Sequence, residues 1–209
     1  MDVTGPRIFV IDDDASVRQG LTRLLRSGGY AVETFSSATA YLQDEPYDGQ
    51  GCLILDLRMP ELNGIDLQSR LIEKGCELPI IFLSGHGDVP VSVWAMKQGA
   101  VDFLTKPVDE AVLFAAVQRA LSVHESIRTR KKIEAGLNEK LRHLTPRELQ
   151  VMRLLLGGAR NKNIGIELGI AEKTVKVHRS KIMEKLNLSS AAELGRFGAL
   201  VGIEPQRFE

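Results

Sequence analysis

The sequence predicts two domains, a doubly wound α/β domain with a five-stranded parallel sheet and an all-α domain of four helices. Three observations predict this division. In residues 1–121, short apolar runs alternate with segments of helical period. In residues 144–209, helical segments are separated by glycines. The charge also changes sign, because residues 1–120 hold 10 Lys and Arg against 17 Asp and Glu, whereas residues 121–209 hold 17 against 10.

Five apolar runs are the expected strands, at residues 8–11, 31–35, 52–56, 80–84 and 101–104. Apolar residues at helical spacing predict helices between them, at 17–25, 65–71, 91–96 and 112–121. Gly28-Gly29 is expected to end the first of these helices. Because strands that alternate with helices form βαβ units, the sheet should be parallel and covered by helices on both faces.

Polar side chains follow four of the expected strands, and they are Asp12-Asp13-Asp14, Asp56, Ser84 and Lys106. In an open α/β sheet, ligands bind outside the carboxyl ends of the strands. Clustered carboxylates repel one another unless a divalent cation lies among them, and Mg²⁺ prefers a few carboxylates together with phosphate oxygens. The sequence therefore predicts a phosphate-handling Mg²⁺ site, with Asp14 interpreted as a helix-entry or solvated acid.

Residues 122–143 are polar and basic and contain no proline. We expect a charged helix that continues from the first domain. Ile133, Leu137, Leu141 and Leu144 space roughly helically, but a solvated spacer is favoured over a coiled coil, which needs sustained heptads. The two cysteines, Cys52 and Cys76, have no metal-ligand spacing and are interpreted as reduced and structural.

The second domain is expected to begin with a capping box at Thr145 and Glu148, with Pro146 at the first helical position. Gly157-Gly158 ends this helix. Further helices are expected at residues 161–168, at 172–186 and, after a second capping box at Ser190 and Glu193, as far as about Leu200. Short helices joined by glycine-marked turns are typical of a helix-turn-helix module.

The segment 172–186 has two distinct faces on a helical wheel. Val175, Ile182 and Leu186 form the expected core face. The opposite face carries Lys173, Lys176, Val177, Ser180, Lys181 and Glu184. Lysines can bind phosphates or guanine edges and an apolar side chain can meet a thymine methyl group, so this face is a candidate DNA reader. The alternative is the solvated face of an ordinary bundle helix.

Two sets of motifs carry a resemblance to known families. In the first domain they are Val10-Ile11-Asp12-Asp13-Asp14, Leu55-Asp56-Leu57-Arg58-Met59-Pro60 with Gly64, the segment 84–90, Ala95-Met96-Lys97, Gly99-Ala100-Val101-Asp102-Phe103 and Lys106-Pro107. In the second they are Leu144-Thr145-Pro146-Arg147-Glu148, Asn161-Lys162, the segment 173–178 and Lys185-Leu186. Residues 7–121 resemble a response-regulator receiver domain and residues 144–205 a LuxR-type helix-turn-helix domain. Together they resemble the FixJ subgroup of two-component transcription factors.

The resemblance implies a flavodoxin-like receiver and a role for each residue of its site. Asp56 accepts the phosphoryl group; Asp12, Asp13, Asp56 and the backbone carbonyl of Arg58 hold Mg²⁺ or Mn²⁺; Lys106 pairs with the phosphoryl oxygens; Ser84 and Phe103 form the switch; and Pro107 follows a cis peptide. The candidate DNA contacts are Lys173, Lys176, Val177, Ser180 and Lys181, with Asn161, Lys162 and Arg179 as further candidates.

The partners implied are a cognate sensor histidine kinase, a double-stranded DNA promoter site and RNA polymerase, with a homodimer formed on phosphorylation. The sequence contains no signal peptide and no apolar stretch long enough to span a bilayer. We therefore expect a cytoplasmic protein with no membrane partner, which is not an enzyme beyond its own phosphotransfer and dephosphorylation.

Two rival interpretations remain. Asp12 and Asp14 form the Asp-x-Asp of haloacid-dehalogenase-like phosphatases, but that reading leaves Asp56 and the Met59-Pro60 turn unexplained and provides no substrate cap. An interaction protein that works without phosphorylation is the second, and the intact acidic triad argues against it.

Two residues depart from the family pattern. Val108 follows Lys106-Pro107 at a position where family members often carry an aromatic residue. Gly165 stands inside a helix where alanine is usual, at an expected cost of about 1 kcal/mol.

Overall fold

The computed structural model describes residues 5–85 and 89–206, and its internal contacts divide the chain into two compact units, residues 1–128 and 129–209. The unit boundary lies inside the expected linker of residues 122–143. Residues 86–88 of the expected 84–90 motif lie outside the described part of the chain.

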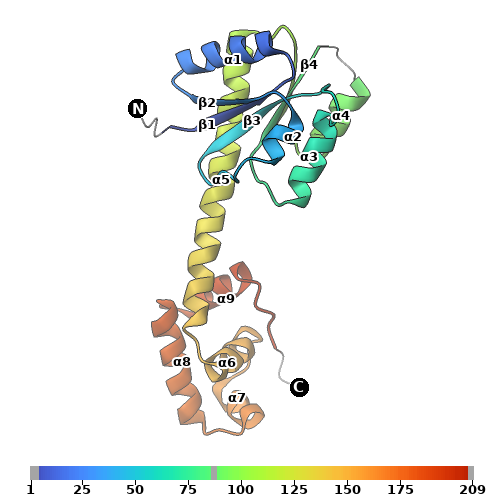
Figure 1. Ribbon diagram of the computed structural model, residues 1–209. Coiled ribbons are helices and arrows are strands. Elements are labelled where there is room, and N and C mark those ends of the chain that lie inside the picture. Colours follow the sequence, from blue (N-terminus) through green and yellow to red (C-terminus); the bar gives the residue numbers. More distant parts are fainter. Residues whose placement is uncertain (1–4, 86–88, 207–209) are drawn as a thin grey trace. The chain divides into compact units, whose positions relative to one another are not determined.

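The first unit is built on a five-stranded parallel sheet with the strand order β2-β1-β3-β4-β5 (Figure 1). The strands are β1 (Arg7–Ile11), β2 (Ala31–Phe35), β3 (Gly51–Asp56), β4 (Ile80–Ser84) and β5 (Asp102–Thr105). The helices are α1 (Ala15–Ser27), α2 (Ala38–Leu42), α3 (Gly64–Glu73), α4 (Val89–Lys97) and α5 (Glu110–Arg142), which continues into the second unit. This order is that of flavodoxin-like folds, so the predicted α/β class is confirmed.

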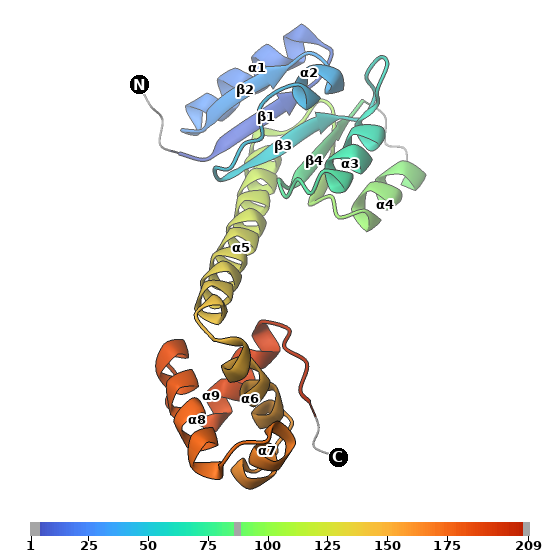
Figure 2. The ribbon, with the colours of Figure 1, turned by 60° about the horizontal axis from the view of Figure 1, so that its bottom comes forward.

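Helices cover both faces of the sheet (Figure 2). Alternate strand residues point to opposite faces. Ile8, Val10 and Ile54 pack with α1 and α5, whereas Phe9 and Leu55 pack with α2, α3 and α4. All six residues of β3 are buried, which is the pattern of a central strand in a parallel sheet. The end of β3 is therefore fixed by packing on both sides.

The short helix α2 was not expected from the sequence. Ser37 caps it, because its hydroxyl accepts a hydrogen bond from the Ala40 N–H at 3.1 Å. Five residues are too few for a helical period to emerge. The signal that could have found α2 is the serine at the N-cap position.

The linker prediction was right about the helix, and most residues of the linker are exposed, as expected of a solvated spacer. Residues 122–142 belong to α5, as expected. His124, however, is only 4% exposed, and its Nδ1 accepts a hydrogen bond from the Gly51 N–H at 3.1 Å. Leu137 and Leu141 pack against the core of the second unit, whereas Ile133 is 55% exposed. Both ends of the segment are thus packed, because apolar and imidazole groups interrupt its charged residues.

The second unit contains α6 (Pro146–Leu156), α7 (Asn161–Leu168), α8 (Glu172–Leu186) and α9 (Ala191–Leu200), as predicted. Its core includes Val151, Met152, Ile164, Val175, Ile182, Leu186 and Phe197. The capping box of Thr145 and Glu148 is confirmed, with Pro146 in the first turn. Gly157 is the C-cap of α6 and Gly169 ends α7 in the left-handed conformation. No helix in the described part of the chain has the length and apolarity needed to cross a membrane.

The second expected capping box forms only in part. The Ser190 hydroxyl accepts a hydrogen bond from the Glu193 N–H at 3.2 Å. The Glu193 carboxylate accepts the Ser189 N–H at 2.6 Å and the Ser189 hydroxyl at 2.9 Å, one residue before the expected partner.

Gly165 is required by close packing, contrary to the expected penalty. The Gly165 carbonyl accepts the Ile170 N–H at 2.9 Å, which closes the turn between α7 and α8. A Cβ atom on Gly165 would lie 2.7 Å from the Ile170 carbonyl oxygen, closer than van der Waals contact allows. Glycine therefore permits the tight turn, and this gain offsets its low helix propensity.

Candidate phosphorylation site and nucleic-acid interface

Three carboxylates meet at the carboxyl ends of β1 and β3. Asp12, Asp13 and Asp56 each offer an oxygen, and these oxygens lie within 4.8 Å of one another. The strands β1 and β3 are paired in register, Ile11 opposite Leu55, so the residues that follow them are neighbours. Asp12 and Asp56 are buried and Asp13 is exposed. The structure thus brings together the three acids that the sequence singled out.

Lys106 bridges two of these acids. Its Nζ donates a hydrogen bond to Asp12 Oδ2 at 2.6 Å and another to Asp56 Oδ1 at 2.6 Å. Burial lowers the pKa of Lys106, but the bonds to both carboxylates outweigh it and the net shift is upward. Burial raises the pKa of Asp56, and Lys106 opposes that rise. Lys106, expected to pair with a phosphoryl group, is therefore charged and bound to carboxylates in this state.

The other predicted residues of this site surround the three acids. The Arg58 N–H donates to Asp56 Oδ2 at 3.1 Å. Ser84 is buried at the end of β4, and its carbonyl accepts the Lys106 N–H at 2.7 Å. The Phe103 ring is half-buried, with its centroid 6.3 Å from that of Phe82. The bond between Lys106 and Pro107 is cis, as the resemblance implied.

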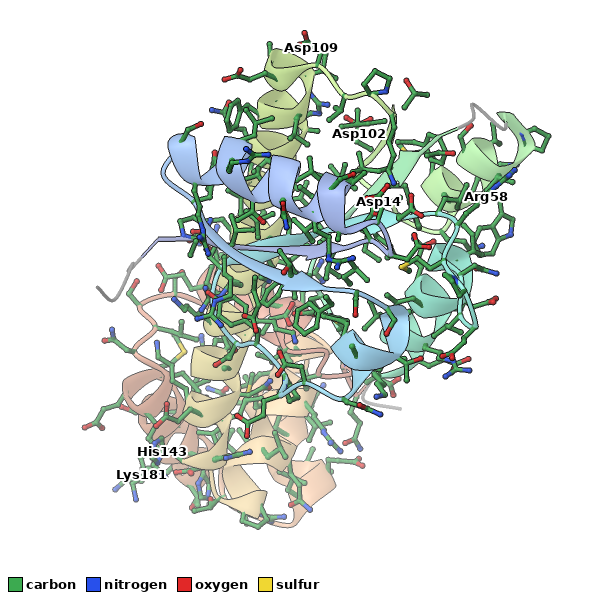
Figure 3. The ribbon with its side chains drawn as sticks, turned by 45° about the horizontal axis from the view of Figure 1, so that its top comes forward. Asp14, Arg58, Asp102, Asp109, His143 and Lys181 are labelled. Atoms are coloured by element: carbon green, nitrogen blue, oxygen red, sulfur yellow. The ribbon has the colours of Figure 1, made fainter. Side chains whose placement is uncertain are left out.

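Asp14 is a helix cap, as expected, and lies at the start of α1 (Figure 3). Its Oδ1 accepts the Ser16 N–H at 2.7 Å and its side chain also accepts the Val17 N–H. The hydrogen bonds from Ser16 lower the pKa of Asp14. Its carboxylate is thus committed to the first turn of α1.

The donor set fits a magnesium ion. Oxygens bound to one octahedral Mg²⁺ lie roughly 3 to 4 Å apart, given metal–oxygen distances of about 2 Å. The three acids need only a small contraction to reach that spacing, since their oxygens already lie within 4.8 Å. Gly64 allows the close approach of the loop after β3, because a Cβ there would lie 2.4 Å from the Asp56 carbonyl oxygen.

The face of α8 that the sequence predicted to read DNA is exposed. Its members are Lys173, Lys176, Val177, Ser180, Lys181 and Glu184, and Lys181 points away from the packed helices in Figure 3. Val177 is 47% exposed, whereas Val175, Ile182 and Leu186 are fully buried. Lys176 makes an ion pair with Glu172 at 3.3 Å. Among the further candidates, Arg179 and Lys162 are exposed and Asn161 is half-buried.

An ion pair between a buried carboxylate and a partly exposed lysine joins α8 to α6. Lys185 Nζ lies 2.7 Å from Glu148 Oε2, and Glu148 is 2% exposed. Sequence reasoning matched both residues to family motifs but did not predict their contact, because they are 37 positions apart. The pair orients the exposed face of α8 relative to the rest of the unit.

Comparison with known families identifies both units. The response regulator receiver domain family matches residues 8–118, and the luxR family of bacterial regulatory proteins matches residues 142–197. The chain belongs to the response regulators. This response regulator is 47% identical to the response regulator protein TodT of Pseudomonas putida over 90% of its own length and 83% of that protein. It is 40% identical to the transcriptional regulatory protein FixJ of Bradyrhizobium diazoefficiens over 96% of its length and 98% of FixJ.

A solved structure agrees with these relatives. The response regulator StyR is 46% identical, with a TM-score of 0.81 over 93% of this chain and 98% of StyR. The predicted family, a receiver domain joined to a LuxR-type domain as in FixJ, is confirmed. This response regulator is a transcriptional regulator of that family, which argues against the phosphatase interpretation.

Proposed function

We propose that this response regulator accepts a phosphoryl group on Asp56 from a sensor histidine kinase and thereby controls its binding to promoter DNA through α8. The observation that carries the proposal is the bridge from Lys106 to Asp12 and Asp56 within a three-carboxylate cluster. A carboxylate attacks phosphorus only when the incoming negative charge is neutralised, and this cluster provides one ammonium and a set of oxygen ligands for a cation.

The transfer itself is a simple exchange of bonds. An Asp56 carboxylate oxygen forms the new P–O bond while the bond from phosphorus to the donor's leaving atom breaks. Asp12, Asp13, Asp56 and the Arg58 carbonyl would hold Mg²⁺ or Mn²⁺, which when bound supplies charge that offsets the phosphoryl oxygens. Lys106 leaves the carboxylates to bind a phosphoryl oxygen. The Ser84 hydroxyl then meets the phosphoryl group, and Phe103 turns inward beside it.

Phosphorylation of Asp56 is tested by mass spectrometry. Acetyl phosphate with Mg²⁺ should add one phosphoryl group to the wild-type chain and none to Asp56→Asn. Asp14→Asn is the matched control, because asparagine is also a good N-cap and Asp14 serves the helix rather than the cluster. An undiminished mass increase in Asp56→Asn would refute the assignment.

The second part of the proposal is a change in assembly and DNA binding. A LuxR-type unit that reads paired half-sites needs two copies, so phosphorylation should shift an existing equilibrium toward a homodimer. Light scattering with and without a stable phosphoryl mimic should show a higher mass with it, and equal masses contradict this. The dimer would then recruit RNA polymerase at a promoter, in the cytoplasm where the DNA lies.

Base reading by α8 is tested with DNA titrations. Val177→Ala should change the preference between an operator selected from random duplexes and unrelated DNA by about 1 to 3 kcal/mol. Removal of a lysine that binds phosphate should weaken binding to all DNA sequences. It should also reduce the slope of log affinity against log salt concentration by about one unit. Arg196→Ala, on the exposed side of α9, is the control. If Lys176→Ala and Val177→Ala both bind the operator as the parent does, α8 is not the reading helix.

A further inference from the structure

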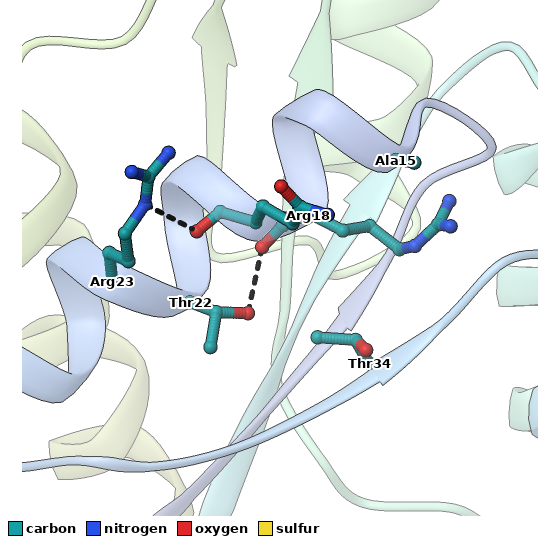
Figure 4. A pocket seen from close by; sticks show the side chains of 6 residues that line it. Ala15, Arg18, Thr22, Arg23 and Thr34 are labelled. Atoms are coloured by element: carbon teal, nitrogen blue, oxygen red, sulfur yellow. Dashed lines mark hydrogen bonds between the residues drawn. The ribbon is translucent and has the colours of Figure 1, made fainter.

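Arg18 joins the first turns of α1 to the acidic loop, a contact that sequence reasoning did not anticipate. Its Nη1 donates a hydrogen bond to the Asp12 carbonyl oxygen at 2.6 Å. The Arg18 backbone N–H donates to the Asp14 carbonyl at 3.1 Å, and the Arg18 carbonyl accepts the Thr22 hydroxyl at 2.7 Å. Arg18 is half-buried along a groove between α1 and β2 (Figure 4). Both its backbone and its side chain therefore bind the loop that carries the acids.

The bonded carbonyl belongs to the peptide that connects Asp12 to Asp13. A peptide unit is planar, so a bond to its oxygen fixes the orientation of the whole unit. That orientation decides in which direction Asp13 leaves the backbone relative to Asp12. Charge-assisted hydrogen bonds from a guanidinium are short and strong, and the one here is 2.6 Å long.

The acidic loop needs such a restraint. Residues 12–14 are three consecutive aspartates, and Asp12 and Asp13 share a cluster with Asp56. Like charges at this spacing repel one another. Lys106 contacts Asp12 and Asp56, and Asp14 is bound to the first turn of α1. Arg18 acts on the remaining element, the peptide between the two expected metal ligands.

We propose that Arg18 is a positioning residue of the divalent metal site, which holds the Asp12–Asp13 peptide so that both carboxylates reach one ion. The inference rests on the proposed function, since it assumes that this cluster binds a divalent cation. Position and charge act in opposite directions here. A guanidinium beside the site repels a cation through its charge, whereas its hydrogen bond preorganises the ligands.

This opposition makes the proposal testable with two variants. Arg18→Lys keeps the charge and loses the planar fork, and Arg18→Gln loses the charge as well. Binding of Mn²⁺ to the full chain is measured directly from the free Mn²⁺ signal in electron paramagnetic resonance. We expect both variants to bind Mn²⁺ roughly tenfold more weakly, as is typical when a residue that orients a metal ligand is lost.

Arg23→Lys is the matched control. Arg23 lies on the same helix and along the same groove, but its Nε donates to the Gln19 carbonyl within α1 at 3.4 Å. Figure 4 shows the Arg23 and Arg18 side chains leaving α1 in different directions. Arg23→Lys should therefore bind Mn²⁺ as the wild type does.

The outcomes separate this inference from the proposed function. If Arg18→Gln binds Mn²⁺ more tightly and Arg18→Lys is unchanged, Arg18 acts through charge alone and the inference is wrong. The inference is also wrong if both Arg18 variants bind Mn²⁺ as tightly as the wild type. The metal site itself is supported if the wild type binds Mn²⁺ and Asp12→Asn does not. A wild-type chain that binds no Mn²⁺ contradicts the metal site itself and the inference with it.

Discussion

Replacing Glu148 with glutamine should destabilise the second unit in a pH-dependent way. Glu148 Oε2 accepts hydrogen bonds from Lys185 Nζ at 2.7 Å and from the Thr145 N–H at 2.8 Å. Burial raises the pKa of Glu148, but the bonds from Lys185 and Thr145 outweigh it and lower the pKa from 4.5 to about 2. Glutamine keeps the shape and an accepting oxygen, so the change removes mainly the ion pair.

The magnitude follows from the pKa. Each tenfold change in an acid dissociation constant corresponds to about 1.4 kcal/mol, so protonating Glu148 would remove about 3 kcal/mol. The Lys185 side chain is 33% exposed and solvent screens its charge, which reduces the expected loss in Glu148→Gln to about 1 to 2 kcal/mol at neutral pH. Because the unfolded state binds the proton first, wild-type stability should fall as the pH drops from about 4.5 toward 2, and the variant should lack this slope.

Urea unfolding of the full chain, followed by NMR through methyl signals of the second unit, measures both effects without interference from the receiver. Lys185→Gln and the double variant complete a double-mutant cycle, which measures the interaction free energy between Glu148 and Lys185. The reasoning is refuted if Glu148→Gln is as stable as the parent at neutral pH, or if both chains lose stability in parallel on acidification.

Two further predictions concern packing that the sequence did not reveal. Gly165→Ala should lower the stability of the second unit by about 1 to 3 kcal/mol, because its Cβ meets the Ile170 carbonyl oxygen; a gain in thermal stability, as helix propensity alone predicts, would contradict this. Burial lowers the pKa of His124 below 6.5, so the unfolded state binds the proton more readily and the first unit should lose stability as the pH falls below 6.5. Denaturant midpoints over pH about 7.5 to 5 should show this loss in the parent and a smaller one in His124→Leu, which also lacks the acceptor for the Gly51 N–H.

The acidic site was predictable because a simple rule links sequence to position. Parallel strands end at one edge of the sheet, so the residues after each strand meet there regardless of what lies between them. Asp12, Asp13 and Asp56 follow this rule, and the helical period in the same way separated the buried Val175 from the exposed Val177. Such features depend on the residue's place in its own element.

Contacts between elements that are distant in the sequence were not predictable. The tie between His124 and Gly51 and the ion pair between Glu148 and Lys185 join residues far apart in the chain. His124, Glu148 and Lys185 taken alone look like ordinary polar residues of a helix, and Gly51 contributes only its backbone N–H. The prediction that Gly165 is unfavourable failed for a similar reason. Helix propensity is a local property, whereas the carbonyl oxygen that Gly165 accommodates belongs to Ile170 in the following turn.

The bridge made by Lys106 has a consequence for the stability of the receiver without a metal ion. An acidic pocket that contained no cation of its own would lose stability through repulsion between its carboxylates, and a bound metal ion would then contribute to its stability. Here the ammonium of Lys106 already lies 2.6 Å from both buried carboxylates, so the receiver closes its own pocket. The folded receiver therefore does not depend on a bound ion, and the divalent cation proposed above would bind and leave while the fold stays intact.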